Sequence, residues 1–129
     1  MLQLNKVHHI AIICSDYEKS KHFYTEILGL TIVQEIYREE RESYKLDLAL
    51  NGEYIVELFS FPNPPERPSR PESCGLRHLA FEVNDMEQTR NFLVQNEIPS
   101  ETIRTDEFTN KRFFFIADPD NLPIEFYEV

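Results

Sequence analysis

Several features are scarce in this sequence of 129 residues, and each shortage excludes a class of protein. No apolar run approaches the roughly 20 residues of a membrane-spanning helix, and the N-terminus has no basic-then-apolar signal segment. Basic residues are few, with 13 Lys and Arg against 23 Asp and Glu, which gives a formal net charge of −10. Because nucleic acids and anionic membranes repel such a chain at long range, neither is expected as a partner.

Glycine and cysteine are rare as well. With three glycines, 41% hydrophobic residues and 12% aromatic residues, the composition is that of a compact globular protein. The chain is long enough for one domain with a core of its own. The two cysteines are Cys14, inside a predicted strand, and Cys74. We expect both to be free, buried thiols in a reducing cytoplasm, because disulfides persist in oxidising compartments.

An internal repeat organises the chain. The segment 7–14 (VHHIAIIC) has a second copy at 76–83 (LRHLAFEV), in which His78 falls on His9. Both copies have an alanine two residues after this histidine and aliphatic or aromatic residues at most other positions. Each copy is followed by a segment with helical spacing of apolar residues. The repeat therefore predicts two modules of similar structure.

The last strand of each module is repeated too. Segment 55–59 (IVELF) returns at 123–127 (PIEFY), so that Glu125 falls on Glu57. Two copies of about 65 residues predict one domain built from two modules, because a solenoid needs roughly three or more repeats to bury a continuous core.

Hydrophobic periodicity and turn residues predict the order β-α-β-β-β in each module. The first module comprises residues 5–61, and we expect strands in it at 6–14, 30–37, 44–50 and 53–61. Its helix is expected to begin with a capping box at Ser15 and to end before Gly29. The Asn51–Gly52 turn is expected to join the last two strands. In the second module, residues 76–129, we expect strands at 76–83, 100–105, 111–117 and 122–128 and a helix at 85–96. Five prolines predict a stiff surface linker at 62–75.

The repeat itself selects four residues with possible chemistry: His9, Glu57, His78 and Glu125. Each glutamate has apolar neighbours on both sides along its strand, so both faces of the strand are apolar and the carboxylate should be paired, protonated or bound to a cation. Two imidazoles and two carboxylates that meet in one cavity would form a site for a divalent transition metal. We therefore predict that these four residues are metal ligands.

Other interpretations of these residues stay open at this stage. A single histidine in a strand is more often a hydrogen-bonded core residue than a ligand, and a single strand glutamate usually faces water. His8 competes with His9 as a ligand, but its repeat partner is Arg77, a long charged side chain suited to solvent. Coincidence would have to place a histidine at one site of both first strands and a glutamate at one site of both last strands. This argues for the metal site.

At these positions the sequence resembles the vicinal oxygen chelate superfamily, which comprises glyoxalases, bleomycin resistance proteins and dioxygenases, and most of all its small bacterial glyoxalase I-like members. The resemblance rests on the segment from His9 to Ile12, Asp16, Phe23–Tyr24, Leu28–Gly29–Leu30, Glu57, His78, Asp118–Pro119–Asp120 and Glu125. It implies an α+β fold in which two βαβββ modules form an open mixed-sheet barrel around one divalent metal ion, Ni, Co, Zn, Mn or Fe, often in a homodimer.

The same resemblance implies an activity. Glyoxalase I binds two adjacent substrate oxygens to its metal and stabilises the enediolate formed when a carboxylate ligand removes a proton. By this similarity Glu125 would be the catalytic base, while His9, Glu57 and His78 would hold the metal. We therefore expect a metal-dependent glyoxalase I-like lyase or isomerase that acts on a small oxygen-bearing substrate.

The sequence departs from glyoxalase I at Ile13, where that family has an arginine that binds a carboxylate of glutathione. Its basic residues lie elsewhere, and we expect five of them to bind an anionic substrate or a thiol adduct: Arg67, Arg70, Arg77, Lys111 and Arg112. The alternative is that these side chains only solvate a proline-rich linker.

Two other classes of function remain on the same scaffold. One is a different metalloenzyme, such as a dioxygenase or a thiol transferase that inactivates an antibiotic. These types use two histidines and one carboxylate, so the presence of both Glu57 and Glu125 argues against them. The other class is a small-molecule binding protein without turnover, whose members commonly lack the four ligands present here.

Overall fold

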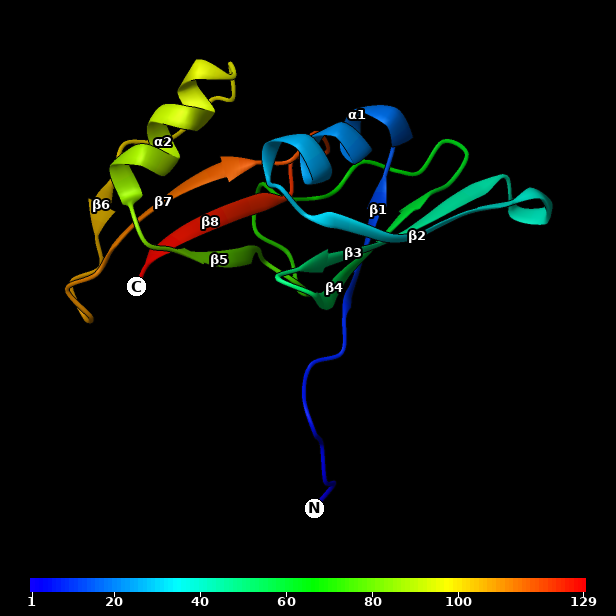
Figure 1. Cartoon of the computed structure of the whole chain (residues 1–129), viewed down its shortest axis with the longest axis horizontal. Helices are drawn as coiled ribbons and strands as arrows, with labels where there is room; N and C mark the ends of the chain where they lie inside the picture. Colours follow the sequence, from blue (N-terminus) through cyan, green and yellow to red (C-terminus); the bar gives the residue numbers. More distant parts are fainter. The chain divides into compact units, whose positions relative to one another are not determined.

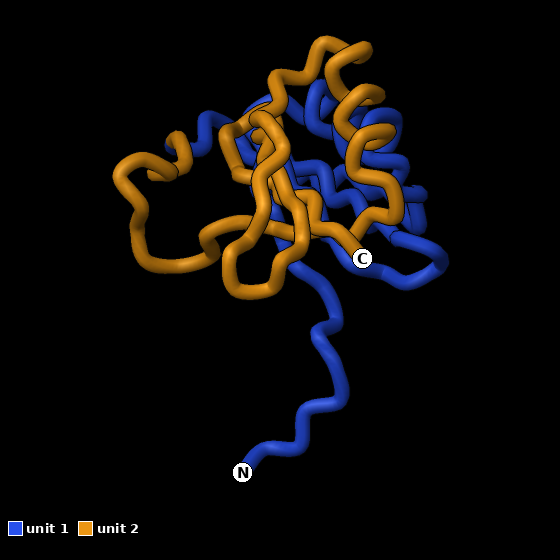
Figure 2. The backbone as a smooth tube through the Cα atoms, turned by 90° about the vertical axis from the view of Figure 1, so that its left-hand side faces the viewer, with its two compact units in different colours: residues 1–65 blue, residues 66–129 orange.

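The computed structural model describes residues 1–129. The chain divides into two compact units, residues 1–65 and residues 66–129 (Figure 2). The division falls inside the segment 62–75 that the prolines mark as a linker. None of the helices has the length and apolar character that crossing a membrane requires.

The first unit contains one mixed sheet with three helical segments (Figure 1). Its elements are β1 (Ile10–Cys14), α1 (Tyr17–His22), the π-helical turn η1 (Phe23–Ile27), β2 (Thr31–Arg38), the short 3₁₀ helix η2 (Glu39–Arg41), β3 (Ser43–Leu50) and β4 (Glu53–Ser60). The strand order is β1-β4-β3-β2. Strand β1 runs parallel to β4, and the other neighbours are antiparallel.

The second unit repeats this topology. Its elements are β5 (Leu79–Val83), α2 (Met86–Gln95), β6 (Arg104–Thr105), β7 (Arg112–Ala117) and β8 (Pro123–Glu128), and its strand order is β5-β8-β7-β6. Strand β5 is parallel to β8, as β1 is to β4. The predicted α+β class and the two βαβββ sheets are confirmed. Each four-stranded sheet keeps two free edges, so neither sheet is closed into a barrel.

An aspartate caps each α-helix at its N-terminus. The Asp16 carboxylate accepts a hydrogen bond from the Lys19 N–H (3.1 Å), and the Asp85 carboxylate accepts one from the Gln88 N–H (2.9 Å). The predicted cap at Ser15 is therefore wrong by one residue. A carboxylate satisfies the free N–H groups of the first turn and also interacts favourably with the helix dipole, which a serine hydroxyl does more weakly.

Backbone conformations at the predicted turns agree with the sequence. Gly29 follows the first helix with φ +79°, a left-handed conformation that an L side chain rarely adopts. Asn51 and Gly52 both have positive φ, at 51° and 83°, as a two-residue hairpin of type I′ requires. The hairpin between β3 and β4 is thus confirmed. It fixes the register of β4, the strand that carries Glu57.

The core of each unit lies between its sheet and its helix, and strand alternation decides which residues enter it. Val56 and Leu58 on β4 are fully buried at 0% exposure, and on β8 Ile124 is 0% and Phe126 5% exposed. The glutamate between each of these pairs must therefore point to the opposite face of its sheet. Burial of the apolar neighbours thereby sets the direction of both candidate ligands.

Both cysteines are free thiols, as expected. Cys14 is 1% exposed, because it lies on the helix-covered side of β1. Cys74 is exposed, so the expectation that it is buried is wrong. It lies in the loop before β5, where no strand or helix covers it.

The turn between β7 and β8 depends on Asp118. This side chain is 5% exposed, and its Oδ1 accepts hydrogen bonds from the backbone N–H groups of Asp120 (2.9 Å) and Leu122 (2.8 Å). We expect Asp118→Ala to lower the free energy of unfolding by about 1–3 kcal/mol, because it leaves these donors without an acceptor. Urea denaturation of both forms measures the difference. Asp118→Asn keeps one oxygen acceptor and should lose clearly less; equal losses in the two variants would contradict this role.

Candidate metal and substrate site

The first candidate pair lies on the two parallel strands of unit 1. Ala11 on β1 is the register partner of Glu57 on β4. His9 precedes Ala11 by two residues, so alternation places its side chain on the same face as Glu57. The distance from His9 Nε2 to Glu57 Oε1 is 3.7 Å. Their side chains are 35% and 15% exposed, so the pair lies at the surface of the open face.

The second pair repeats this arrangement in unit 2. Ala80 on β5 is the register partner of Glu125 on β8, and His78 precedes Ala80 by two residues. The distance from His78 Nε2 to Glu125 Oε2 is 2.9 Å, and these side chains are 26% and 13% exposed. The sequence repeat is therefore also a repeat of position, since each unit places one histidine beside one glutamate on the uncovered face of its sheet.

In unit 1, basic and hydroxyl groups surround the pair. Lys45 Nζ lies 3.3 Å from Glu57 Oε2 and donates to both oxygens of Asp47, at 2.8 and 2.9 Å. The Tyr54 hydroxyl lies 3.2 Å from Asp47 and 3.3 Å from Glu57, and its ring stacks on His9 with centroids 5.0 Å apart. Hydrogen bonds to Asp47 and then to Glu57 raise the pKa of Lys45. Glu57 is thus compensated by a lysine that stays charged.

In unit 2, an arginine takes the place of these groups. Arg77 Nη1 lies 3.1 Å from His78 Nδ1. A guanidinium has donors and no acceptor, so Nδ1 must accept this hydrogen bond. The ring proton of neutral His78 is then on Nε2, from which it is donated to Glu125. The Phe115 ring stands edge-on to His78 with centroids 5.1 Å apart and closes the other side.

The two units differ most at the strand next to the glutamate. Asp47 is the register partner of Glu57, whereas Phe115 is the register partner of Glu125. In the same way Lys45 of β3 corresponds to Phe113 of β7. One pair therefore lies in a hydrogen-bonded polar cluster and the other lies beside aromatic rings.

The donor set fits a divalent metal, although neither unit alone supplies a complete site. No group of three or more His, Cys, Asp or Glu side chains within a unit is arranged to hold an ion. Two donors bound to one ion at about 2.0–2.2 Å lie roughly 3 Å apart. The separations within the pairs, 3.7 and 2.9 Å, need only small movements to satisfy this. Each pair thus fits half of the predicted centre, and the four-residue site remains a prediction.

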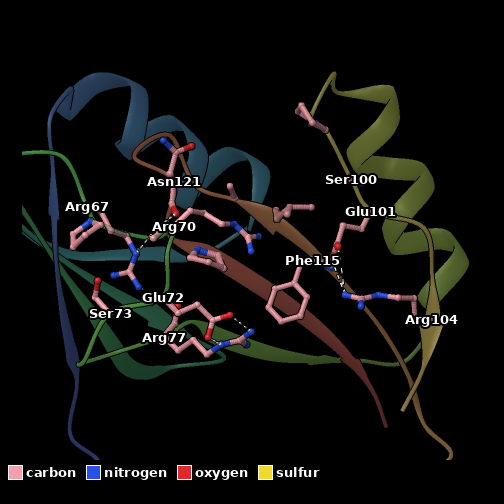
Figure 3. Close-up of a pocket in the computed structure, with 16 residues that line it drawn as sticks. Arg67, Arg70, Glu72, Ser73, Arg77, Ser100, Glu101, Arg104, Phe115 and Asn121 are labelled. Carbon is pink, nitrogen blue, oxygen red and sulfur yellow. Dashed lines mark hydrogen bonds and ion pairs between the residues drawn. The ribbon is translucent and has the colours of Figure 1, made fainter. Parts of the chain in front are cut away.

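Beside the second pair, unit 2 contains a cavity of about 880 Å³ (Figure 3). The linker, the loop before β6 and the ends of β7 and β8 supply its walls. Its polar lining residues are Arg67, Ser69, Arg70, Glu72, Ser73, Arg77, Ser100, Glu101, Arg104 and Asn121. Arg77 and Phe115 belong to this lining and both contact His78, so the cavity adjoins the His78–Glu125 pair. A volume of this size suits a small-molecule ligand.

The cavity contains three of the five basic residues expected to bind substrate, namely Arg67, Arg70 and Arg77. The other two lie outside its lining. Lys111 Nζ donates to the carbonyl of Val129 (2.7 Å). Arg112 is bound by the carboxylates of Glu87 and Glu128. Both hydrogen bonds raise the pKa of Arg112, the one to Glu87 more than the one to Glu128. Nothing in the cavity supports a substrate-binding role for Lys111 or Arg112.

Among the basic residues of the cavity, sequence reasoning missed one, Arg104. It forms the short edge strand β6, where its guanidinium contacts Glu101 (3.1 Å) and lies over the Phe113 ring. The only signal in the sequence was a cation inside a predicted strand, which does not show which surface it faces. His8, the competing ligand, has its Nδ1 2.8 Å from His9 Nδ1 and contacts no carboxylate.

These features define a class of protein: a duplicated βαβββ fold with a His–Glu pair on the open face of each sheet. Comparison with known families agrees with this class. The model of the Glyoxalase/Bleomycin resistance protein/Dioxygenase superfamily matches residues 6–126, and the chain belongs to this family. The family includes enzymes.

Close relatives share the whole chain. The uncharacterized protein YaeR of Escherichia coli (strain K12) is 61% identical over 128 residues, which cover 99% of each chain. The uncharacterized protein YwkD of Bacillus subtilis (strain 168) is 62% identical over 125 residues, which cover 97% of this chain and 98% of the relative. The crystal structure of the glyoxalase family protein from Enterococcus faecalis is 44% identical with a TM-score of 0.89, and covers 95% of this chain and 97% of its own.

More distant structures share the fold and differ in chemistry. They include a trypanothione-dependent glyoxalase I from Leishmania major, 22% identical with a TM-score of 0.73, and the fosfomycin resistance protein FosX from Listeria monocytogenes, 16% identical with a TM-score of 0.78. One fold thus occurs in proteins of different function, so the reaction of this protein has to be argued from its site.

The contact between Arg77 and His78 predicts which nitrogen of the His78 imidazole carries the proton. In metal-free protein at about pH 8.5, where an ordinary imidazole is neutral, we expect long-range ¹H–¹⁵N NMR to show His78 protonated on Nε2. Arg77→Met removes the donor to Nδ1 and should shift the tautomer population towards Nδ1–H. Arg104→Met is the matched control and should leave His78 unchanged. Wild-type His78 protonated mainly on Nδ1 would show that Arg77 does not set the tautomer.

Proposed function

We propose that this protein is a divalent-metal-dependent lyase or isomerase of the glyoxalase I type, which removes a proton from a small substrate that carries two neighbouring oxygens. The observation that carries this proposal is the His–Glu pair that recurs at the same register in both units. Membership of the glyoxalase superfamily supports it. A duplicated pair supplies two imidazoles and two carboxylates, a donor set suited to nickel, cobalt, zinc, manganese or iron.

In this proposal His9, Glu57 and His78 are holding ligands. A divalent ion held by the four side chains would supply a Lewis acid for the negative charge that develops on a substrate oxygen. Glu57 suits a fixed role, because Lys45 and Tyr54 hold its Oε2 at 3.3 Å each. In this proposal the two pairs would share one ion, either within one chain or between the two copies of a homodimer.

Glu125 is the proposed general base. Its Oε2 accepts a hydrogen bond from His78 Nε2. To hold a metal through Nε2, neutral His78 would carry its proton on Nδ1, so both this bond and the hydrogen bond from Arg77 to Nδ1 would be given up. Without that bond, Glu125 could turn either to the ion as its fourth ligand or to a substrate as the base. The adjoining Phe115 ring limits the access of water on one side, which strengthens electrostatic interactions at the carboxylate.

The substrate is proposed to be other than a glutathione adduct. Ile13, which replaces an arginine of the glyoxalase I pattern, is 55% exposed on the end of β1. An exposed isoleucine offers no hydrogen bond or charge to a glutathione carboxylate. A small molecule or the adduct of another thiol fits the site better, and we propose that the protein acts on it in the cytoplasm, where Cys14 and Cys74 stay reduced.

Two substitutions separate the base from the ligands. Glu125→Gln keeps the volume and one oxygen donor, so we expect it to retain metal with weaker affinity and to lose about 10²–10⁴ in rate. His78→Ala removes a ligand and should leave the protein largely metal-free. Metal content is measured by elemental analysis after loading with each metal in turn, and activity by a lyase assay with methylglyoxal and a panel of small thiols.

Glu82→Gln is the matched control, since Glu82 is an exposed glutamate on β5. It should change neither the metal content nor the rate. Wild-type protein that binds none of the five metals would refute the metal site. Wild-type turnover by Glu125→Gln would show instead that the proton is taken by another group.

A further inference from the structure

The cavity of unit 2 has a charge opposite to that of the protein as a whole. Four arginines and two glutamates line it, which gives a formal charge of +2, whereas the whole chain carries −10. Since anions are repelled by the rest of the surface, a positive cavity on this chain is a specific feature that points to an anionic ligand.

Three of the four arginines already have partners in the protein. Arg67 donates to the Ser69 hydroxyl (2.8 Å) and to the carbonyls of Leu76 (2.6 Å) and Arg77 (3.1 Å). It therefore fastens the linker to the residues just before β5. The Ser69 hydroxyl in turn donates to the carbonyl of Asn121 (2.9 Å), so the linker is also tied to the turn before β8. This wall of the cavity is held in place by four hydrogen bonds within the protein.

Arg77 and Arg104 are oriented by carboxylates. Arg77 binds both oxygens of Glu72, at 2.9 and 3.0 Å, and Arg104 contacts Glu101 at 3.1 and 3.4 Å. Each guanidinium has five N–H donors, and such a pair uses only some of them. Their charges are, however, largely compensated by the partner carboxylates.

Arg70 is the arginine of this cavity for which the structure gives no hydrogen bond or ion pair; its charge acts on Glu72 only at longer range, as a minor cause of the lowered pKa of that carboxyl. It is exposed to solvent, and Figure 3 shows its side chain extending from the linker into the cavity, on the side of Asn121. The Ser73 hydroxyl on the same linker has only a long contact, 3.5 Å, to a backbone carbonyl. A planar guanidinium with free donors is suited to bind a carboxylate or phosphate through two parallel hydrogen bonds.

We infer that this cavity binds an oxyanion of the substrate, a carboxylate or a phosphate group, and that Arg70 is its principal contact. The inference deepens the proposed function and rests on it for one step, the identity of the ligand as substrate. The cavity adjoins His78 and Glu125 through Arg77 and Phe115. A small anionic molecule anchored at Arg70 would share this cavity with Arg77 and Phe115, the two residues that contact His78, and would be held close to the proposed base.

The test is a binding titration that needs no turnover. Full-length protein is titrated with inorganic phosphate and, separately, with malonate, and followed by ¹H–¹⁵N NMR at constant ionic strength. We expect millimolar binding, with shifts at Arg70, Ser73 and Asn121, for at least one anion. Arg70→Gln should weaken it ~10-fold or more, as loss of a charged bidentate contact predicts. The preferred anion distinguishes a phosphate from a carboxylate substrate.

Arg41→Gln is the matched control, because it removes one exposed arginine from unit 1 and changes the net charge equally. It should leave both affinities unchanged. Absence of binding by both anions, or equal weakening in the two variants, would overturn the inference. The titration measures neither metal binding nor lyase activity. Failure of the proposed reaction would therefore leave the anion-binding result intact, and failure of anion binding would leave the proposed metal site intact.

Discussion

Parallel pairing of the first and last strands of each module is the constraint on which the site depends. It brings a histidine and a glutamate that are about 48 positions apart in sequence to the same face of one sheet. A shift of one residue in β4 or β8 would turn the glutamate into the core and its apolar neighbours to solvent. The buried side chains of Val56, Leu58, Ile124 and Phe126 oppose such a shift. Burial of these apolar side chains thus fixes the direction of Glu57 and Glu125, which lie outside the core.

The duplicated frame carries different surroundings in its two halves. Lys45 and Asp47 occupy positions in unit 1 that Phe113 and Phe115 occupy in unit 2. The lysine compensates Glu57 at short distance, so that carboxylate is held in one position. Glu125 has an imidazole beside it in place of an ammonium group. The two carboxylates are therefore equivalent by register and unequal in chemistry, which is what a fixed ligand and a mobile base require.

The proline-rich linker is a wall of the cavity as well as a connection between modules. Prolines lower its conformational freedom, and the hydrogen bonds of Arg67 and Ser69 tie it to β5 and to the turn before β8. Ordering this segment in the folded protein presents Arg70 to the cavity at a small entropic cost on binding. The proposed anion site would give the charged linker residues a specific role beyond simple solvation.

The sequence by itself determined the βαβββ order of both modules and the turns at Gly29 and Asn51–Gly52, because periodicity and turn chemistry are local signals. Its internal repeat also selected His9, Glu57, His78 and Glu125 as candidate ligands, and their joint role at one metal remains a prediction. Two boundaries were predicted wrongly. The first strand was expected from residue 6, whereas β1 begins at Ile10, and the first helix cap was expected at Ser15, whereas Asp16 is the cap. Only the tertiary structure decided which arginines share a cavity. Arg104 joins it, paired with Glu101 three residues earlier in the chain. Arg112 does not, because it is bound by Glu87 and Glu128, which lie on other elements and far from it in the sequence, and no local pattern records such pairings.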